Sequence, residues 1–150
     1  MTSGRSALFL DVATELLSRG RWMRFRAEGD SMYPTIRGGE TIVVEPVSPL
    51  DLGDGDIALY SSRRGVTAHR VVEVRTPGAE PVFITRGDNV GSADEPIEAG
   101  QVLGRVVAVE RKGLSVNLRG RRAKLKFLTR RYASVLKRTV RAGCSTWNTR

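Results

Sequence analysis

The sequence predicts a mainly β domain, built on a coiled, barrel-like, antiparallel sheet and flanked by an amphipathic helix at each end. Short runs of β-type residues alternate with turn signals through the middle of the chain. Near both termini, by contrast, apolar residues recur at helical spacing. With 150 residues, the chain has room for one compact domain and an appendage, but not for separate substrate and cofactor lobes.

The first predicted element is a helix over residues 5–19. Gly20 follows it at a position where glycine commonly ends a helix. The spacing of three and four residues places one set of apolar side chains on a common side of this helix. That set consists of Leu8 or Phe9, Val12, Leu16 and Leu17.

Seven strands are predicted after this helix, because apolar and β-branched runs are separated by Gly, Pro and Asp. The turn signals include Pro77-Gly78 and Gly87-Asp88-Asn89. Short strands at this spacing favour mostly antiparallel pairing. The predicted strands are Trp22–Ala27, Thr41–Glu45, Asp56–Tyr60, Val66–Val74, Val82–Thr85, Val102–Glu110 and Leu114–Leu118.

A second helical pattern covers residues 121–141, which divides the chain into a main domain, 1–119, and a basic tail, 120–150. Apolar residues lie on one side of this pattern and basic residues fill the rest. Three interpretations remain open. The helix could pack on the β domain and leave a solvated basic face, lie on an anionic membrane surface, or bind nucleic acid.

The formal net charge of +9 is unevenly distributed along the chain. Residues 1–110 contain 12 arginines and all 16 acidic residues, which gives 12 − 16 = −4. Residues 111–150 contain 13 basic residues and no acidic ones, which gives +13. The basic charge that would indicate nucleic-acid or membrane binding therefore belongs to the tail. No lysine precedes Lys112.

The chain shows no signature of an oxidising compartment or of a membrane span. Cys144 is the only cysteine, so no intramolecular disulfide can form. The longest apolar runs have four residues, far fewer than the roughly 20 that cross a bilayer. No secretory signal pattern opens the sequence. We therefore expect a cytoplasmic protein, either free or attached to a membrane surface.

Ser31 lies in a segment that can present its hydroxyl at the end of a strand. Gly29 allows a tight backbone path, and Pro34 has a restricted φ. Asp30 is expected to cap this turn. The alternative is an ordinary turn in which Ser31 or Asp30 only satisfies the backbone.

The remaining groups of a serine-based active site occur further along the chain. His69 is the only histidine and lies in an alternating β run, and Asp88 and Asp94 follow the next strand. Serine, histidine and aspartate act as nucleophile, base and base-orienter in covalent acyl transfer. Arg70 is expected on the opposite face of its strand from His69, either solvated or paired with Asp88 or Asp94.

Four short motifs occur in the order found in the signal peptidase I family. The sequence resembles the endoplasmic-reticulum and archaeal members, in which histidine replaces lysine as the general base. The absence of lysine before Lys112 agrees with this type. The resemblance implies the peptidase fold of the signal peptidase and SOS-repressor type. The motifs are Gly29-Asp30-Ser31-Met32-x-Pro34-Thr35, Gly55-Asp56-Ile57, His69-Arg70-Val71 and Gly87-Asp88-Asn89.

The resemblance also implies roles for individual residues. Ser31 corresponds to the nucleophile and His69 to the base, which later protonates the leaving amine. Asp94 corresponds to the acid that orients the imidazole, and Asp88 either shares this role or holds the site together. The backbone N–H of Ser31, in the turn that begins at Gly29, is the expected oxyanion donor.

The predicted activity requires only protein groups, so no cofactor or metal is expected. Met32 and Pro34 are predicted to be structural residues beside the nucleophile. The substrate class is a peptide or protein.

Signal peptidases are anchored in the membrane, whereas this sequence predicts no spanning segment. We therefore expect a soluble or membrane-peripheral serine endopeptidase, with residues 1–119 as its catalytic domain. One alternative is a self-cleaving repressor-type peptidase, although that family uses lysine as base. Another is a catalytically inert peptidase fold whose basic tail binds nucleic acid or anionic lipid, nucleic acid being the less favoured partner. The sequence makes no prediction of oligomeric state.

Overall fold

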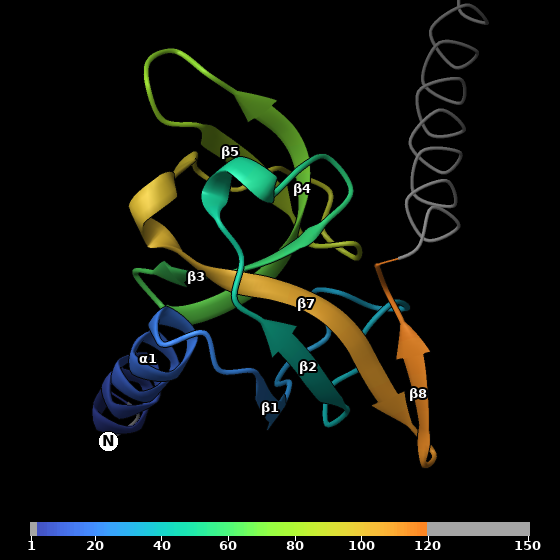
Figure 1. The fold of residues 1–150 in the computed structure, drawn as a ribbon. Helices are drawn as coiled ribbons and strands as arrows, with labels where there is room; N and C mark the ends of the chain where they lie inside the picture. Colours follow the sequence, from blue (N-terminus) through green and yellow to red (C-terminus); the bar gives the residue numbers. More distant parts are fainter. Residues whose placement is uncertain (1–2, 120–150) are drawn as a thin grey trace, which may run out of the picture.

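The computed structural model describes residues 3–119, which form one antiparallel sheet with a helix beside it (Figure 1). The predicted basic tail, 120–150, with its helix at 121–141, lies outside the described residues. The helix is α1 (Ser3–Ser18), and two short 3₁₀ helices are η1 (Pro49–Asp51) and η2 (Ala99–Gln101). The strands are β1 (Met23–Arg26), β2 (Thr41–Glu45), β3 (Ile57–Ser62), β4 (Gly65–Arg75), β5 (Val82–Arg86), β6 (Ile97–Glu98), β7 (Val102–Arg111) and β8 (Leu114–Asn117).

Seven of the eight strands follow the order β1-β2-β7-β3-β4-β5-β6. The eighth, β8, pairs with residues 108–111 of β7, beyond the residues of β7 that pair with β3. All strand pairs are antiparallel. The prediction of a mainly β, antiparallel fold is therefore confirmed. The expected barrel is not formed, because β1 and β6 end the order without pairing with each other in the described part of the chain.

All seven predicted strands are present, with ends shifted by a few residues. The sequence does not predict β6, because a strand of two residues is too short to show alternation. The opening helix is also confirmed and begins two residues before the predicted start, at Ser3. Turn residues therefore located the elements well, while strand ends depended on pairing with neighbours.

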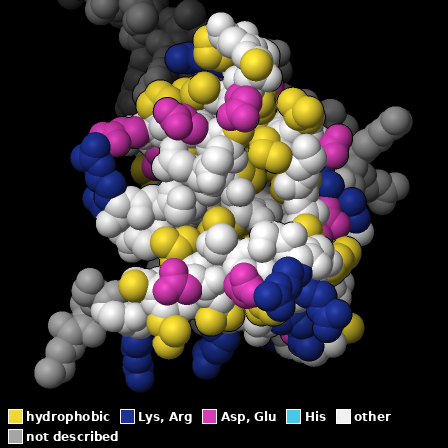
Figure 2. All heavy atoms as spheres, turned by 60° about the vertical axis from the view of Figure 1, so that its left-hand side comes forward, with side chains coloured by type: hydrophobic (Ala, Val, Ile, Leu, Met, Phe, Trp, Pro, Cys, Tyr) yellow, Lys and Arg dark blue, Asp and Glu magenta, His cyan; other side chains and the backbone are white. Residues whose placement is uncertain are grey.

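Of the predicted apolar set, only Phe9 and Leu17 lie on the side of α1 that packs on the sheet. Ala13 and Leu17 are buried, and the ring of Phe9 packs edge-on against Phe25 of β1 with 4.8 Å between ring centroids. Consecutive apolar residues in this helix allow two rows one residue apart, and the Phe9–Phe25 contact selects one of them. Hydrophobic side chains consequently reach the surface on the side that carries α1 (Figure 2). The exposed row is Leu8, Val12 and Leu16.

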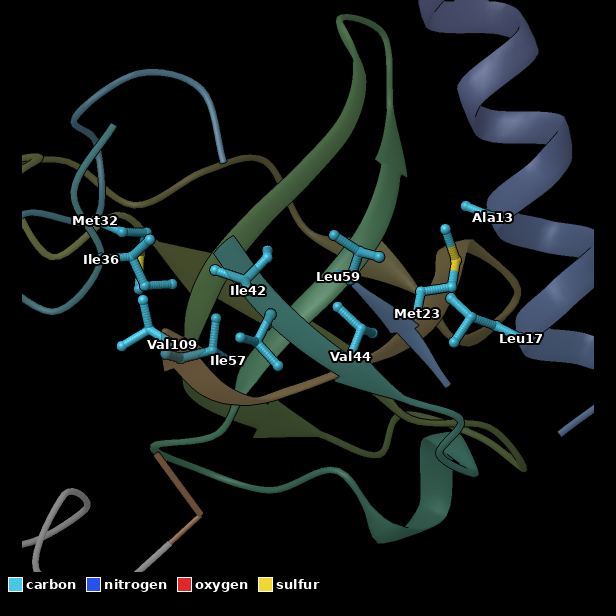
Figure 3. Packing of buried hydrophobic residues seen from close by; sticks show 11 residues of the cluster. Ala13, Leu17, Met23, Met32, Ile36, Ile42, Val44, Ile57, Leu59 and Val109 are labelled. Atoms are coloured by element: carbon cyan, nitrogen blue, oxygen red, sulfur yellow. The ribbon is translucent and has the colours of Figure 1, made fainter. Parts of the chain in front are cut away.

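Strand β3 separates two hydrophobic clusters, because its side chains alternate between the faces of the sheet. Ile57 and Leu59 belong to the larger cluster, and Ala58 and Tyr60 to the smaller one. Figure 3 shows the larger cluster extending from Met32 and Ile36 in the β1–β2 loop to Ala13 and Leu17 in α1. The core thus connects the loop that carries Ser31 to the helix.

Among residues 3–119, no helix combines the length and the apolar character that are needed to cross a bilayer.

Candidate active site

Ser31 lies in the loop of residues 27–40 that joins β1 to β2. Gly29 has a φ of +74°, in the left-handed region that favours glycine. The Met32 side chain is buried in the larger cluster, as the sequence predicts, while Ser31 beside it stays partly exposed. The buried methionine therefore attaches the loop to the core and leaves the adjacent hydroxyl at the surface.

Asp30 stabilises the same loop from within. Its carbonyl accepts a hydrogen bond from the Tyr33 N–H at 3.1 Å, and its carboxylate accepts one from the Gly38 N–H at 3.1 Å. This is the capping role that the sequence predicts for Asp30. Pro34 is half-buried and follows Tyr33 through a cis peptide bond.

A second loop, between β5 and β6, holds the backbone around Ser31. Asn89 donates its backbone N–H to the Ser31 carbonyl at 2.8 Å and its side-chain amide to the Asp30 carbonyl at 3.2 Å. Gly87 allows this approach, because a Cβ at that position would lie 2.6 Å from the Ser31 carbonyl oxygen. The sequence alone predicts no role for Gly87 or Asn89 beyond their place in the Gly87-Asp88-Asn89 motif.

His69 on β4 connects Ser31 to Asp94. The imidazole Nε2 lies 3.0 Å from Ser31 Oγ, and Nδ1 lies 2.6 Å from Asp94 Oδ2. A carboxylate can only accept, so Nδ1 carries the proton and Nε2 is free to accept from the serine hydroxyl. The His69 and Asp94 side chains are 12% and 28% exposed. The structure therefore brings together three of the four predicted catalytic residues.

Two buried hydroxyl groups that sequence reasoning missed complete the surroundings of Asp94. Thr85 Oγ1 donates to Asp94 Oδ2 at 2.8 Å, and the Tyr60 hydroxyl lies 3.3 Å from the same oxygen. Burial, together with the negative charge of Asp94, raises the pKa of Tyr60 to about 12. Tyr60 therefore remains a hydrogen-bond donor at neutral pH. A threonine and a tyrosine are ordinary strand residues, so nothing local in the sequence marks them.

Asp88, the fourth predicted catalytic residue, lies with Arg70 rather than with His69. Arg70 Nε donates to Asp88 Oδ1 at 2.8 Å and Nη2 to Oδ2 at 2.7 Å, and the Thr35 hydroxyl also donates to Oδ2. The two side chains are 4% and 10% exposed. Of the two roles open to Asp88, the geometry favours holding the site together over orienting the base.

Asp88 and Asp94 have different partners because the side chains of His69 and Arg70 alternate along β4. His69 pairs across the sheet with Ala58, which belongs to the smaller cluster, and Arg70 pairs with Ile57, which belongs to the larger one. Cross-strand partners share a face, so His69 and Arg70 lie on opposite faces of β4. This confirms the predicted direction of Arg70. Of the two aspartates that were open as its partner, Asp88 forms the ion pair. Arg70 Nη1 also donates to the Gly55 carbonyl at 2.8 Å.

Within residues 3–119, no three His, Cys, Asp or Glu side chains lie close enough together to form a metal site. Every buried side-chain nitrogen or oxygen among the same residues has a hydrogen-bond partner.

Comparison with known proteins adds no family to this description. No protein-family model matches the chain, and no curated protein matches it. The resemblance to signal peptidases therefore remains a prediction from the sequence motifs.

Proposed function

We propose that this protein is a serine endopeptidase that cleaves a peptide bond through an acyl-enzyme on Ser31. The observation that carries the proposal is the continuous hydrogen-bonded chain from Ser31 Oγ through His69 to Asp94, with links of 3.0 and 2.6 Å. Nucleophile, base and base-orienter within hydrogen-bond reach form the arrangement that activates a neutral serine. The substrate class is a peptide or protein.

In the first half of the reaction, Ser31 Oγ attacks the peptide carbonyl carbon while His69 Nε2 takes the hydroxyl proton. Among the described residues, no hydrogen bond engages the Ser31 N–H. That N–H is therefore available to donate to the oxyanion of the tetrahedral intermediate. The intermediate collapses when His69 gives the proton to the leaving nitrogen, which breaks the C–N bond and leaves an ester on Ser31.

In the second half, His69 Nε2 takes a proton from water, and the hydroxide oxygen attacks the ester carbonyl. Breaking the C–O bond returns Ser31 Oγ, which regains a proton from His69, and releases the new carboxylate. Asp94 keeps the proton on Nδ1 throughout and stabilises the imidazolium that forms in each half. No net proton remains on the protein after one turnover.

The site supports a histidine base over the lysine base of self-cleaving repressors. Lys112, the only lysine among the described residues, is exposed in the turn between β7 and β8. His69 already occupies the position beside Ser31 Oγ that such a base would need. A soluble or membrane-peripheral peptidase of histidine type is therefore the form of the activity that we propose.

The proposal is tested with a proteome-derived peptide library incubated with the full chain, new peptide termini being identified by mass spectrometry. The wild type is expected to generate termini with a shared sequence preference, and Ser31→Ala to generate none above background. Ser92→Ala is the matched control, because Ser92 is an exposed serine in the β5–β6 loop. Equal cleavage by wild type and Ser31→Ala, or no cleavage by either, would overturn the proposal.

A further inference from the structure

We propose that Thr85 and Tyr60 are positioning residues of this site, and that their two hydroxyl groups hold the Asp94 carboxylate in the orientation that directs His69 toward Ser31. The inference rests on the proposed peptidase function. According to this inference, two residues on strands fix the orientation of Asp94, which lies on a loop. Neither residue touches the reacting atoms, so both act through Asp94.

Asp94 needs such support, because it lies in an irregular segment between β5 and β6 and its side chain is 28% exposed. Thr85, on β5, is fully buried. It binds Asp94 twice, accepting the Asp94 N–H at its carbonyl (2.8 Å) and donating its hydroxyl to Oδ2 (2.8 Å). Thr85 thus connects both the backbone and the carboxylate of Asp94 to the sheet.

Tyr60, on β3, reaches the same carboxylate from a second strand. Its hydroxyl lies 3.3 Å from Asp94 Oδ2, and its ring lies edge-on to the His69 ring with 6.4 Å between centroids. Burial keeps this hydroxyl protonated, since it raises the pKa of Tyr60 to about 12. Tyr60 therefore restrains both partners of the His69–Asp94 pair.

Three groups converge on one oxygen, Asp94 Oδ2, at 2.6, 2.8 and 3.3 Å. The Thr85 and Tyr60 hydroxyl oxygens also lie 3.2 Å apart. Each of the side chains of Thr85, Tyr60 and Asp94 therefore contacts the other two. Rotation of the carboxylate would break the three contacts of Oδ2 together. A fixed Oδ2 selects the imidazole tautomer with its proton on Nδ1, and this tautomer leaves Nε2 able to accept from Ser31.

The burial of these hydroxyls has no evident packing purpose. Thr85 and Tyr60 are 0% and 3% exposed, and burying a hydroxyl costs free energy unless it is hydrogen-bonded. Valine and phenylalanine would fill the same space without that cost. The hydroxyl groups are therefore explained by Asp94, the partner that they share.

The first test observes His69 directly, which is simple because the chain has one histidine. In the full chain labelled with ¹⁵N, the ring nitrogen shifts report which nitrogen carries the proton. We expect the Nδ1–H tautomer to predominate in wild type. In Thr85→Val and Tyr60→Phe, its share is expected to fall and the low-field Nδ1 proton signal to broaden. The double variant is expected to show the largest change.

The second test follows the rate of cleavage of a single peptide that the library identifies as a substrate, because kcat and KM are defined for one substrate. Thr85→Val and Tyr60→Phe are each expected to lower kcat by about tenfold to a hundredfold, the usual effect of misplacing a catalytic group, with KM nearly unchanged. Thr85→Ser is the matched control, because it keeps the hydroxyl and loses a methyl group. A packing role predicts that Ser is worse than Val, whereas a positioning role predicts the reverse.

The outcomes separate this inference from the proposed function. If the tautomer and kcat of Thr85→Val and Tyr60→Phe match the wild type while cleavage still requires Ser31, the positioning role is wrong and the peptidase function stands. Greater loss in Thr85→Ser than in Thr85→Val would also overturn the positioning role. If no variant and no wild type cleaves, the proposed function fails, and the NMR result still decides whether the hydroxyls orient Asp94.

Discussion

On each face of strand β4, one basic side chain pairs with one aspartate, and the two pairs differ. On one face, His69 meets Asp94 at 2.6 Å, with side chains 12% and 28% exposed. On the other face, Arg70 meets Asp88 at 2.7 Å, with side chains 4% and 10% exposed. The residues adjoin in sequence, and both aspartates come from the segment between β5 and β6.

The difference between these pairs lies in the basic side chain and in its exposure to solvent. A histidine can exchange a proton near neutral pH, whereas an arginine keeps its charge at any ordinary pH. The His69–Asp94 pair is the more exposed of the two, and Ser31 beside it is partly exposed. The Arg70–Asp88 pair is enclosed, and Thr35 and Gly55 bind it further. Adjacent residues can therefore serve chemistry and structure separately when a strand directs them to opposite faces.

The largest predicted effect concerns the first pair. We expect His69→Ala to lower kcat on a single peptide identified from the library by about 10⁴-fold or more, since the serine loses its base. The free energy of unfolding in urea should change by only about 1 kcal/mol, because Asp94 is 28% exposed and keeps its hydrogen bonds to Thr85 and Tyr60. A variant that kept wild-type turnover would remove His69 from the mechanism.

Breaking the second pair should produce the opposite pattern. Asp88→Ala leaves the Arg70 charge buried without its carboxylate, which typically costs about 3–5 kcal/mol. Urea unfolding measures this loss. Asp94→Ala, the matched variant on the other face, should lose less stability and more activity. If Asp94→Ala destabilised the fold as much as Asp88→Ala, the two aspartates would not differ as proposed.

Gly87 allows a third comparison, because it lies at the contact between the two loops. A Cβ there would approach the Ser31 carbonyl oxygen to 2.6 Å and Val90 Cγ2 to 2.8 Å. Gly87→Ala should therefore displace Ser31 and lower kcat by about 10²-fold. Gly91→Ala in the same loop is the control, since nothing lies within 4 Å of its Cβ position. Equal rates in the two variants would contradict the close contact.

The smallest predicted effect is a pH dependence of stability. Because burial raises the pKa of Tyr60 from 10 to about 12, the folded state binds one more proton than the unfolded state between these values. Stability is therefore retained below pH 10 and lost as the pH rises toward 12, by up to about 2 kcal/mol. Urea unfolding at pH 9 to 12 should show this loss in wild type and a smaller one in Tyr60→Phe. If the free energies of unfolding of wild type and Tyr60→Phe fell equally with pH, the hydroxyl of Tyr60 would not be protected from ionisation by the fold.

Much of the fold could be predicted from local patterns. Turn residues and alternation located all seven longer strands, and helical spacing located α1. The packed side of α1 could not be predicted, because two apolar rows were equally consistent with the sequence. The contact between Phe9 and Phe25 selects one row, and that contact joins different elements.

The sequence by itself determined which chemistry was available: one histidine, no lysine before Lys112, and a serine in a turn made by glycine and proline. It left Asp88 and Asp94 as alternatives and did not indicate Tyr60 or Thr85. Only the tertiary structure decided between the aspartates, because the pairing of β4 with its neighbours sets which face each side chain occupies. Residue types are local information, whereas hydrogen-bond partners depend on strand register.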